Sequence, residues 1–433
     1  MEIQTNCKCG KTHIFTSEVI VKEGALQELP GILERYNAKK VFLIADQNTY
    51  EAAGKTVRQI IESQVKVASC IFCEDGLEPD EYSVGRAVMY YEEDCDVVIG
   101  VGSGVINDIG KIVANVAGKP YFIVGTAPSM DGYASATSSM TRDGLKISLP
   151  SKCADVIIGD LDVLCQAPAK MMASGLGDML AKYVSICEWR IANIITGEYY
   201  CEDIAQLVRE ALKKCAENAD GLLKREKEAV KAVFEGLVIG GVAMAYAGVS
   251  RPASGVEHYF SHVWDMRGIA FGTPVDFHGI QCAIATYHAI RLYEMVKQQT
   301  PNYEKASTYV TAFDQNAWER TLRDFLGKGA EAMIALEKKE GKYCKDKHPA
   351  RFQIIAENWD SIVKIIEEEL PPAEEIARLL AAIGISTDFS AIGIDTACAR
   401  TTFMASKDIR DKYVLSRLAW DLGILDMLAQ QIS

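Results

Sequence analysis

The chain of 433 residues is 49% apolar and 24% charged, a balance typical of a globular protein and not of a disordered or fibrous one. Its net charge is −13 and its basic residues are scattered, which argues against a surface that neutralises nucleic-acid phosphates. No run of about eighteen uncharged apolar residues indicates a membrane span. The start, MEIQTNCKCGKTH, has no apolar stretch of signal-peptide type. We therefore expect a cytoplasmic protein of about two or three domains.

The cysteines point to a reducing compartment. Their number, 13, is odd and their spacing is irregular, so reduced thiols explain them better than a disulfide framework. Cys7, Cys9 and His13 in CKCGKTH have the residue types of half a zinc knuckle. No second pair follows at knuckle spacing, so the sequence does not predict a metal there and leaves the role of this segment open.

In the first part of the chain, short apolar runs alternate with stretches of helical periodicity at 49–63 and 79–93. The runs are nearly all apolar, which predicts parallel strands buried on both faces. They lie at 41–46, 65–72, 96–102 and 120–128. This alternation predicts an α/β, Rossmann-like domain, which we place at residues 1–167.

From Pro168 onward the character of the chain changes. Long segments of helical period appear, such as MASGLGDMLAKYVSICEWR, with hardly any strand signal. The charged stretch 327–347 predicts a solvated helix face and a loop. We therefore predict an all-α C-terminal domain over residues 168–433. A ligand site is expected in the cleft between the two domains, where such sites concentrate.

A glycine-rich turn, GSGVIND, follows the predicted strand 96–102 and opens a helix. Backbone N–H groups in such a turn can approach an anion closely, and the helix N-terminus adds roughly half a positive charge. The turn therefore suits a pyrophosphate. Its spacing is neither G-x-G-x-x-G nor that of a P-loop, and tight strand-to-helix turns use glycine without any ligand.

Two more polar segments follow predicted strands, where an open α/β sheet places its ligand contacts. Asp46 ends the run LIAD, a position where dinucleotide folds bind ribose hydroxyls, but an Asp there also caps turns and helices. The segment 125–140, GTAPSMDGYASATSSM, is rich in hydroxyl groups and contains Asp131. Hydroxyl-rich loops are often plain turns, so both explanations stand.

Histidine is scarce, with six residues in the chain, yet four of them fall between 258 and 288. With Asp178 in SGLGDMLAKY, His258 and His278 supply one carboxylate and two imidazoles, which leave coordination positions open on a zinc-like ion. His262 follows His258 by one helical turn, within reach of a bound substrate. Single histidines on apolar helices are also common as core or surface residues, or paired with carboxylates such as Glu257.

The strings GVGSGVIND, TAPSMDGYAS, GLGDMLAKY, SRPASGVEHYFSH and FHG, in this order and spacing, resemble the sn-glycerol-1-phosphate dehydrogenases of the bacterial, AraM-like branch. That family belongs to the group of 3-dehydroquinate synthases, glycerol dehydrogenases and iron-containing alcohol dehydrogenases. The resemblance covers essentially the whole chain. It implies a dehydroquinate synthase-like fold, an NAD(P)H cofactor, one divalent metal ion and a homodimer.

The resemblance also implies roles for single residues. Asp178, His258 and His278 resemble the metal ligands, with Asp178 also beside the substrate. Asp131 resembles the substrate-binding aspartate, and His262 resembles the substrate-contacting histidine. Motifs and resemblance together predict these cofactor-binding residues: Asp46, Gly102, Ser103, Gly104, Val105, Ile106, Asn107, Asp108, Thr126, Ala127, Pro128, Ser129 and Ser135.

The implied activity is the reversible reduction of dihydroxyacetone phosphate to sn-glycerol 1-phosphate with NAD(P)H, as part of phospholipid metabolism. The metal would polarise the ketone carbonyl while hydride arrives from the nicotinamide. His262, Asp131 or a bound water would supply the proton. Zinc and nickel both suit the donor set, iron less so. Asp46 favours NAD by repelling a 2′-phosphate, although the choice between NAD and NADP stays open.

The substrate phosphate needs a basic partner. Arg251 in SRPASG is our candidate, because a guanidinium matches phosphate oxygens in a bidentate manner. Lys146 and Lys182 are the alternatives. A glycerol or other polyol dehydrogenase would share the metal and cofactor sites but need no phosphate pocket, and a non-catalytic metal- or nucleotide-binding regulator is a third possibility. No nucleic-acid or membrane partner is expected.

Overall fold

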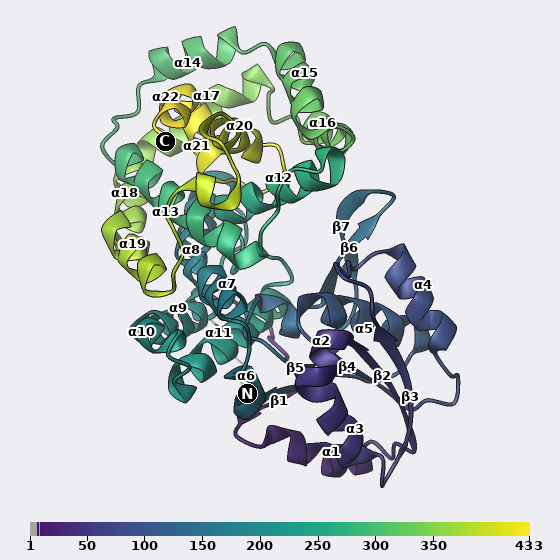
Figure 1. The fold of residues 1–433 in the computed structure, drawn as a ribbon. Helices are drawn as coiled ribbons and strands as arrows, with labels where there is room; N and C mark the ends of the chain where they lie inside the picture. Colours follow the sequence, from purple (N-terminus) through teal and green to yellow (C-terminus); the bar gives the residue numbers. More distant parts are fainter. Residues whose placement is uncertain (1–6, 8) are drawn as a thin grey trace. The chain divides into compact units, whose positions relative to one another are not determined.

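The computed structural model describes residue 7 and residues 9–433. The described chain divides into two compact units, which Figure 1 shows with the chain coloured along its length. We call residues up to Met179 together with 206–249 the sheet unit, and residues 180–205 together with 250–433 the helical unit. The sheet unit thus includes helices that lie beyond 168 in sequence. The division at 167 and 168 stays a prediction about the functional domains.

Six parallel strands form the main sheet of the sheet unit, in the order β1-β8-β5-β4-β2-β3. Their bounds are β1 (Glu18–Lys22), β2 (Lys40–Asp46), β3 (Lys66–Phe72), β4 (Val97–Gly102), β5 (Tyr121–Gly125) and β8 (Val156–Asp160). The four predicted strands are confirmed as β2 to β5. The chain reverses its direction of winding between β2 and β4, which are paired neighbours, and open α/β sheets bind ligands at such a point.

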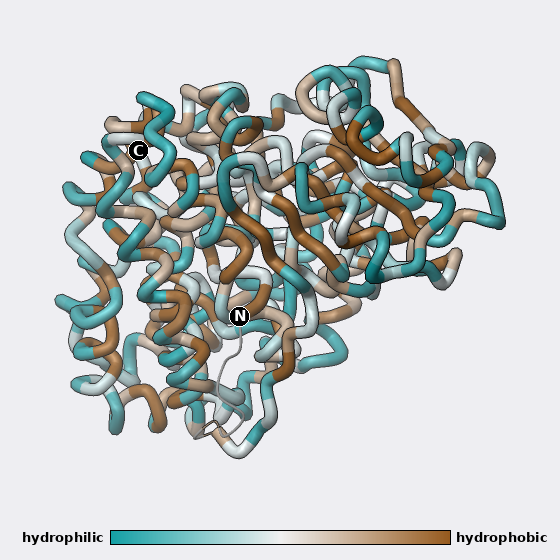
Figure 2. The backbone as a smooth tube through the Cα atoms, turned by 90° about the horizontal axis from the view of Figure 1, so that it is seen from below, coloured by the Kyte–Doolittle hydropathy of each residue, from teal (hydrophilic) through white to brown (hydrophobic). Residues whose placement is uncertain are grey.

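An apolar layer lies under one face of this sheet, where side chains of the strands meet those of α1 and α3. Figure 2 shows the strands as brown, hydrophobic tube. On the other side, α5 packs on β4 and α4 packs on α5. The bounds of these first helices are η1 (Ala25–Glu28), α1 (Leu29–Arg35), α2 (Gln47–Thr49), η2 (Tyr50–Gly54), α3 (Lys55–Ile61), α4 (Glu81–Tyr90) and α5 (Gly104–Ala117). Both helical stretches predicted between the strands are present.

Two glycines around the β4–α5 connection make room for Tyr121 on β5. A Cβ on Gly100 would lie 2.3 Å from the Tyr121 hydroxyl oxygen, and one on Gly110 would lie 2.5 Å from it. A Cβ on Gly102 would meet Ile106 at 2.6 Å. Part of the glycine pattern in GVGSGVINDIG is therefore explained by packing of α5 against the sheet.

A short antiparallel hairpin, β6 (Thr137–Arg142) and β7 (Leu145–Pro150), follows the short helix η3 (Asp131–Ala134). Asp143 and Gly144 form its turn with φ of 54° and 73°. The sequence analysis did not predict this hairpin, the edge strand β1 or the strand β8, which lies between β1 and β5. β1 begins and ends with a charged residue, and the hairpin strands mix polar and apolar residues, so neither forms a continuous apolar run. The apolar run of β8 is Val156–Ile158, before Gly159 and Asp160.

The rest of the sheet unit is helical: α6 (Leu161–Leu164), α7 (Ala169–Leu180), α9 (Glu202–Glu217), α10 (Ala219–Leu222) and α11 (Lys227–Ala247). By length and composition α11 could cross a membrane, but 72% of its apolar window is buried inside the protein. Its Phe234 fills the space above Gly125 and Gly159, where a Cβ would come within 2.7 Å and 2.5 Å of the ring. We therefore read α11 as a core helix.

The helical unit contains no strand within its described residues, which confirms the all-α prediction. Its helix α12 (Val256–Phe271) packs along α13 (His278–Val296) and against α20 (Thr396–Ser406). The others are α8 (Lys182–Thr196), α14 (Tyr303–Ala312), α15 (Gln315–Leu326), α16 (Gly329–Glu340), η4 (Lys345–Lys347), α17 (His348–Glu357), α18 (Trp359–Glu369), α19 (Ala373–Ala382), η5 (Phe389–Ile392), α21 (Leu415–Asp421) and α22 (Leu425–Gln430). The charged stretch 327–347 forms α16 and the loop after it.

Candidate metal and cofactor sites

Three histidines of the helical unit come together where α12 meets the start of α13. His258 lies in the first turn of α12, and His278 is the first residue of α13. Their ring centroids are 5.0 Å apart, and the ring of His262 lies 5.9 Å from that of His278. His288 lies elsewhere, stacked on Phe389 at 4.0 Å. Of the four crowded histidines, three therefore form a cluster that suits metal binding.

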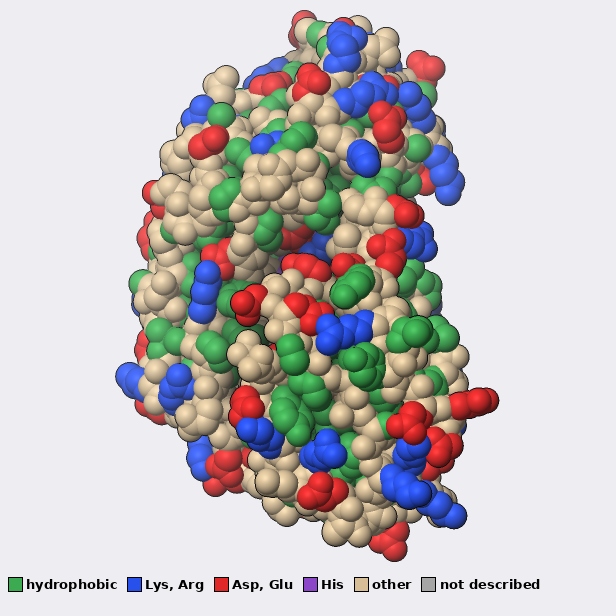
Figure 3. Space-filling view, turned by 45° about the vertical axis from the view of Figure 1, so that its right-hand side comes forward, with side chains coloured by type: hydrophobic (Ala, Val, Ile, Leu, Met, Phe, Trp, Pro, Cys, Tyr) green, Lys and Arg blue, Asp and Glu red, His purple; other side chains and the backbone are tan. Residues whose placement is uncertain are grey.

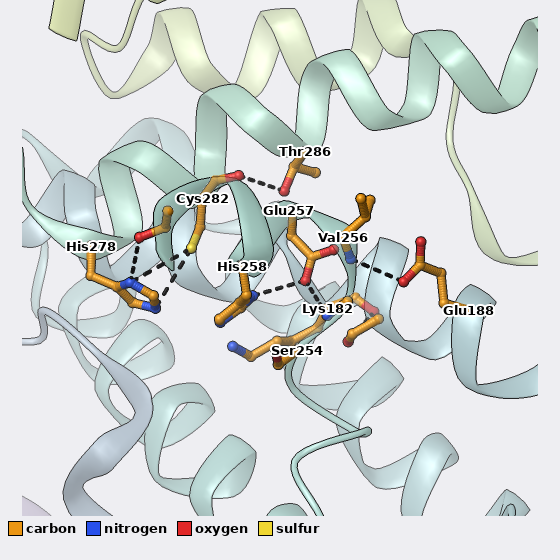
Figure 4. Close-up of polar contacts among 12 residues, drawn as sticks. Lys182, Glu188, Ser254, Val256, Glu257, His258, His278, Cys282 and Thr286 are labelled. Atoms are coloured by element: carbon orange, nitrogen blue, oxygen red, sulfur yellow. Dashed lines mark hydrogen bonds and ion pairs between the residues drawn. The ribbon is translucent and has the colours of Figure 1, made fainter. Parts of the chain in front are cut away.

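A buried carboxylate orients the first imidazole. The Nδ1 atom of His258 lies 2.8 Å from Glu257 Oε1, which also accepts the backbone N–H of Gly255 at 2.6 Å (Figure 4). Behind it, Glu188 accepts the N–H of Val256 at 2.9 Å. Burial, followed by the nearby Glu257, raises the pKa of Glu188 to about 8. Because Glu257 engages Nδ1, Nε2 is the nitrogen of His258 that could ligate a metal ion.

The second imidazole is fixed through a chain of polar side chains. The Nδ1 atom of His278 lies 2.8 Å from Ser261 Oγ. The amide of Gln281 donates to Ser261 Oγ at 3.1 Å and to Asp265 Oδ1 at 2.9 Å. All three supporting side chains are buried. Nearly all metal-ligating histidines are held by such a bond at their other nitrogen, so this donor set fits a divalent ion.

Cys282, which the sequence analysis did not single out, lies beside these rings. Its Sγ atom is 3.6 Å from His278 Nε2, and His258, His278 and Cys282 each offer one donor atom within 4.8 Å of the others. Burial raises the pKa of the Cys282 thiol, but the neighbouring imidazoles outweigh it and the net shift is downward. The only sequence signal is that residue 282 follows His278 by one helical turn, a spacing that a core cysteine would share.

The sheet unit brings its two predicted acidic residues together. Asp178 lies in the last turn of α7 and is fully buried, and Asp131 begins η3. The backbone N–H of Asp131 donates to Asp178 Oδ2 at 3.0 Å. A buried carboxylate that is oriented by a backbone N–H has the chemistry of a metal ligand, since ligating carboxylates are themselves hydrogen-bonded.

The β4–α5 turn has the features of a dinucleotide phosphate site. Ser103 precedes α5, which is 14 residues long, so the N–H groups of its first turn have no partner inside the helix. Ser103 Oγ lies 2.5 Å from Ser129 Oγ, and Thr126 N–H donates to the Gly102 carbonyl at 3.1 Å. Gly102 and Gly125 are paired at the ends of β4 and β5. Two predicted cofactor segments, 102–108 and 126–129, are therefore adjacent.

Other predicted cofactor residues use their side chains inside the protein. The amide of Asn107 donates to the Gly132 carbonyl at 2.9 Å, and Asp108 forms an ion pair with Lys111 at 3.2 Å. Burial raises the pKa of Asp108, with Lys111 acting in the opposite direction. The Asn107 contact ties α5 to η3, whereas the Asp108–Lys111 pair lies within α5. Ile106 packs on Gly102. The Tyr133 hydroxyl donates to the Ala127 carbonyl, and Ser135 Oγ accepts the Thr137 N–H.

Helix α7 supports the same loop from below. A Cβ on Gly175 would lie 1.8 Å from the carbonyl oxygen of Pro128, and Ser174 donates to the Ser129 carbonyl at 3.0 Å. The helix backbone therefore approaches the 126–129 loop as closely as glycine allows. Because Asp178 is on the same helix, the carboxylate and the loop are held by one element.

Asp46 caps α2. Its Oδ1 accepts the Thr49 N–H at 2.9 Å, and its own N–H donates to Thr49 Oγ1 at 3.1 Å. The capping explanation is confirmed, whereas the ribose contact stays a prediction. Asp46 ends β2, the neighbour of β4, so it lies at the same edge of the sheet as Gly102.

Arg251 is buried and already engaged. Its Nε and Nη2 atoms donate to the two carboxylate oxygens of Glu198 at 2.7 Å and 2.6 Å, and Nη1 donates to the Tyr413 carbonyl at 3.0 Å. A phosphate would have to replace Glu198. Of the alternatives, Lys146 is exposed on β7, and Lys182 is buried and lies beside the Glu257–His258 pair in Figure 4.

Cys7 and Cys9 lie close to His13. The Nδ1 atom of His13 lies 3.1 Å from the Tyr246 carbonyl oxygen, and its Nε2 lies 3.3 Å from Cys9 Sγ. The N–H of Cys9 points to Cys7 Sγ at 3.5 Å. On the face shown in Figure 3, side chains of both charge signs are mixed.

Comparison with known proteins gives consistent results. Residues 20–168 match the family model described as iron-containing alcohol dehydrogenase. A glycerol-1-phosphate dehydrogenase [NAD(P)+] from Halalkalibacterium halodurans is 34% identical over 388 residues, 88% of this chain and 87% of that protein. The enzyme of the same name from Bacillus subtilis is 30% identical over 66% of this chain and 73% of its own length.

Solved structures resemble the fold. A glycerol dehydrogenase from Schizosaccharomyces pombe gives a TM-score of 0.61 at 18% identity, covering 97% of this chain and 92% of that one. A 1,3-propanediol oxidoreductase gives 0.62 at 15% identity, covering 96% and 99%. At these identities the likeness concerns the fold alone.

Proposed function

The chain belongs to the family of the NAD(P)-dependent glycerol-1-phosphate dehydrogenases, and from this premise we propose that it interconverts dihydroxyacetone phosphate and sn-glycerol 1-phosphate. The observation that carries the proposal is the pair His258 and His278, whose Nδ1 atoms contact the buried oxygens Glu257 Oε1 and Ser261 Oγ. The chain also spans 87% of the length of such a dehydrogenase. A histidine that only fills the core needs no second histidine oriented in the same way, whereas a metal centre needs several ligands that are each held in place.

We infer that Asp178, His258 and His278 bind one divalent ion. Such an ion, when bound, acts as a Lewis acid on the substrate carbonyl and stabilises negative charge on its oxygen during hydride transfer. The Glu257 carboxylate accepts from Nδ1 of His258, which assigns Nε2 to the metal, and the Ser261 hydroxyl can accept from Nδ1 of His278 in the same way. Zinc is our choice for the ion, with nickel as the alternative and iron less favoured.

For the cofactor, we propose that the N–H groups at the start of α5 bind the pyrophosphate of NAD(P). Ser103 Oγ and Ser129 Oγ are hydrogen-bonded to each other, and the Thr126 N–H donates to the Gly102 carbonyl, so these residues adjoin the start of α5. Asp46 at the end of β2 is our candidate for the ribose hydroxyls, which favours NAD over NADP. The side chain of Asn107 supports this site by fixing η3 to α5. Asp108 pairs with Lys111, which donates to the Gly132 and Thr137 carbonyls, and Ser135 Oγ accepts the Thr137 N–H at the start of the hairpin.

Proton transfer is assigned to His262 or Asp131. His262 lies one turn from His258 on α12, and an imidazole can deliver a proton to an alkoxide near neutral pH. Asp131 is held beside Asp178 through its backbone and is our candidate for a substrate hydroxyl. Arg251 is our candidate for the substrate phosphate, but the phosphate would have to compete with Glu198 for the guanidinium. Lys182 and Lys146 therefore stay alternatives. A homodimer in the cytoplasm is part of the proposal.

The test combines metal analysis with an activity assay. Purified enzyme is expected to contain about one catalytic metal equivalent per chain by this proposal. It should reduce dihydroxyacetone phosphate with NADH and lose that activity on chelation or in a His278→Ala variant. The matched control is His288→Gln, which alters a histidine of the same helix outside the cluster. Reductase activity that survives both chelation and His278→Ala would contradict the proposal.

A glycerol or other polyol dehydrogenase is the second candidate, and one observation favours it. The guanidinium of Arg251 is neutralised by Glu198, so it offers no ready phosphate site. Rates on dihydroxyacetone equal to or above those on its phosphate would support this candidate. If no reductase activity appears with any divalent metal, a non-catalytic binding protein remains.

A further inference from the structure

The reaction proposed above makes no use of Cys7, Cys9 and His13. These three residues of the sheet unit nevertheless lie close together. His13 is 5% exposed although it lies in a chain segment without helix or strand. Its Nδ1 faces the Tyr246 carbonyl oxygen at 3.1 Å. Because a carbonyl oxygen only accepts, Nδ1 carries the hydrogen and Nε2 carries the lone pair. That lone pair is directed toward Cys9.

The two cysteines complete a compact set of soft donors. Cys9 Sγ lies 3.3 Å from His13 Nε2, and one donor atom from each of Cys7, Cys9 and His13 lies within 4.8 Å of the others. Sulfur and nitrogen ligands of a tetrahedral zinc ion are about 3.6 Å apart, from bond lengths of about 2.3 Å and 2.0–2.1 Å. The observed spacing is close to this value, and the two cysteines are not joined by a disulfide.

The backbone of the segment also favours a charged sulfur. The Cys9 N–H points to Cys7 Sγ at 3.5 Å, and Gly10 N–H donates to the Cys7 carbonyl at 3.0 Å. Gly10 has φ of 75°, a conformation that glycine adopts without strain, so the chain turns back over Cys7. A hydrogen bond from an N–H stabilises a thiolate more than a thiol.

We propose that Cys7, Cys9 and His13 form a structural zinc site, separate from the catalytic centre, with the fourth position filled by another donor of the chain or by water. Two thiolates and an imidazole select zinc over magnesium or calcium. The site would anchor the start of the chain to the end of α11 through the His13 contact with Tyr246.

Metal content of the full-length enzyme tests this site. After dialysis against excess free zinc and then buffer, a Cys7→Ser/Cys9→Ser variant should hold one zinc ion fewer per chain than wild type. It should keep its reductase activity, because neither residue belongs to the reaction site. Cys73→Ser, an exposed thiol of the same unit, is the matched control and should keep the full zinc content. Equal zinc content in the double variant and wild type would overturn the proposal.

Substitutions of His13 separate the loss of a zinc ligand from a folding defect in the double variant. His13→Cys restores a soft donor and should retain the zinc ion, whereas His13→Gln should lose it. Loss of zinc in both, with both proteins folded by circular dichroism, would also count against the site.

A second, independent observation concerns Cys282 in the helical unit. The distance of 3.6 Å from its Sγ to His278 Nε2 equals the separation of about 3.6 Å between sulfur and nitrogen ligands on a tetrahedral zinc ion. Thr286 donates to the Cys282 carbonyl at 2.8 Å, and Cys282 has no exposed surface. A buried cysteine that only filled space would lie equally well against apolar side chains.

We infer that Cys282 ligates the same divalent ion as His258 and His278 in the resting enzyme, and that its soft sulfur biases this site toward zinc. The inference rests on the proposed metal-dependent function. A thiolate ligand raises the affinity for zinc relative to iron or manganese, which prefer oxygen and nitrogen donors. Substrate binding would then expand the coordination or displace the sulfur.

Cobalt substitution reports directly on such a ligand. In the Cys7→Ser/Cys9→Ser background, which removes the other soft site, the cobalt enzyme should show a thiolate-to-cobalt charge-transfer band in the near ultraviolet. Adding Cys282→Ser should abolish this band, and adding Cys187→Ser, a buried thiol of the same unit, should leave it. Cys282→Ala serves as a second variant if the serine is not tolerated.

The failure of this inference is distinguishable from failure of the proposed function. A cobalt enzyme that reduces dihydroxyacetone phosphate but has no charge-transfer band, or keeps it in Cys282→Ser, overturns the ligand role alone. A band that depends on Cys282 in a protein without reductase activity supports the ligand role and contradicts the proposed reaction.

Discussion

Ser261 Oγ lies 2.8 Å from Nδ1 of His278, so Nε2 is the nitrogen of that imidazole that our proposal assigns to the metal. Ser261 itself is held by Gln281, which also donates to Asp265. The polar chain runs from α12 to the first turns of α13, so the packing of these two helices fixes the orientation of the ring.

Ser261→Ala should therefore weaken metal binding. Loss of such a supporting hydrogen bond typically costs about 10–100-fold in metal affinity. Competition with a fluorescent zinc chelator measures the change. Ser406→Ala, another buried serine of the helical unit, is the control and should bind as wild type does. Unchanged affinity in Ser261→Ala would mean that the His278 ring is held by packing alone.

Gly175→Ala should impair cofactor binding through the 126–129 loop. The new Cβ would lie 1.8 Å from the Pro128 carbonyl oxygen, so either α7 or the loop must move. We expect the Kd for NADH to rise by about tenfold, which is about 1.4 kcal/mol of binding free energy. Gly31→Ala in α1, with no atom within 4 Å of its Cβ, is the control. Calorimetric titration with NADH distinguishes the two variants.

Asp46→Ser should change the choice of cofactor without losing the helix cap. Serine also accepts a hydrogen bond at the N-cap position, while the negative charge that repels a 2′-phosphate disappears. We expect the ratio of kcat/KM for NADPH to that for NADH to rise by about tenfold, since one removed charge repulsion is worth about 1.4 kcal/mol. Asp80→Ser, which caps α4 in the same manner, should leave the ratio unchanged. An unchanged ratio in Asp46→Ser would exclude a contact between Asp46 and the ribose of the cofactor.

Much of the cofactor half of the protein could be predicted from the sequence, because buried parallel strands are continuous apolar runs that stand out from their surroundings. The strands β2 to β5 and the turn at Gly102 were found in this way. Edge strands such as β1 are short and flanked by charge, so they do not stand out. Periodicity also places His258 and His262 on one face.

Cys282 and the partners of Arg251 could not be predicted in the same way. A cysteine in an apolar helix has the same local pattern whether it faces the core or a metal. The Glu198 partner of Arg251 is 53 positions away in sequence, so only the fold shows that the guanidinium is occupied. The His13 contact with Tyr246 spans 233 positions for the same reason.

Glu198→Gln should destabilise the protein and also test the phosphate pocket. It leaves the Arg251 guanidinium, which is 1% exposed, without a compensating charge. Because the Glu198 side chain is 30% exposed, we expect a loss of about 2–3 kcal/mol in the free energy of unfolding, below the range for a fully buried pair. Urea denaturation measures it. A lower KM for dihydroxyacetone phosphate in this variant would support Arg251 as the phosphate ligand.

His288 should make stability depend on pH in acid. Burial lowers its pKa to about 4, against the ordinary value of 6.5, so the folded chain keeps the imidazole neutral. As pH falls from 6.5 toward 4, the imidazole becomes protonated in the unfolded chain but not in the folded chain. The free energy of unfolding therefore falls by up to about 3 kcal/mol. The difference in unfolding free energy between wild type and His288→Gln should narrow or reverse between pH 7.5 and pH 4.5. A constant difference would contradict this assignment.

The space that Gly100, Gly110 and Tyr121 share has a consequence for how this protein can diverge. The Tyr121 ring occupies the volume that side chains at both glycine positions would need, so the three positions can change only as a group. Among descendants of this chain, alanine at 100 or 110 should be found only where residue 121 has become smaller. Since Gly100 and Gly110 flank the turn that opens α5, such a compensated exchange would shift the helix start, and with it the affinity for the dinucleotide, before any residue that touches the cofactor has been replaced.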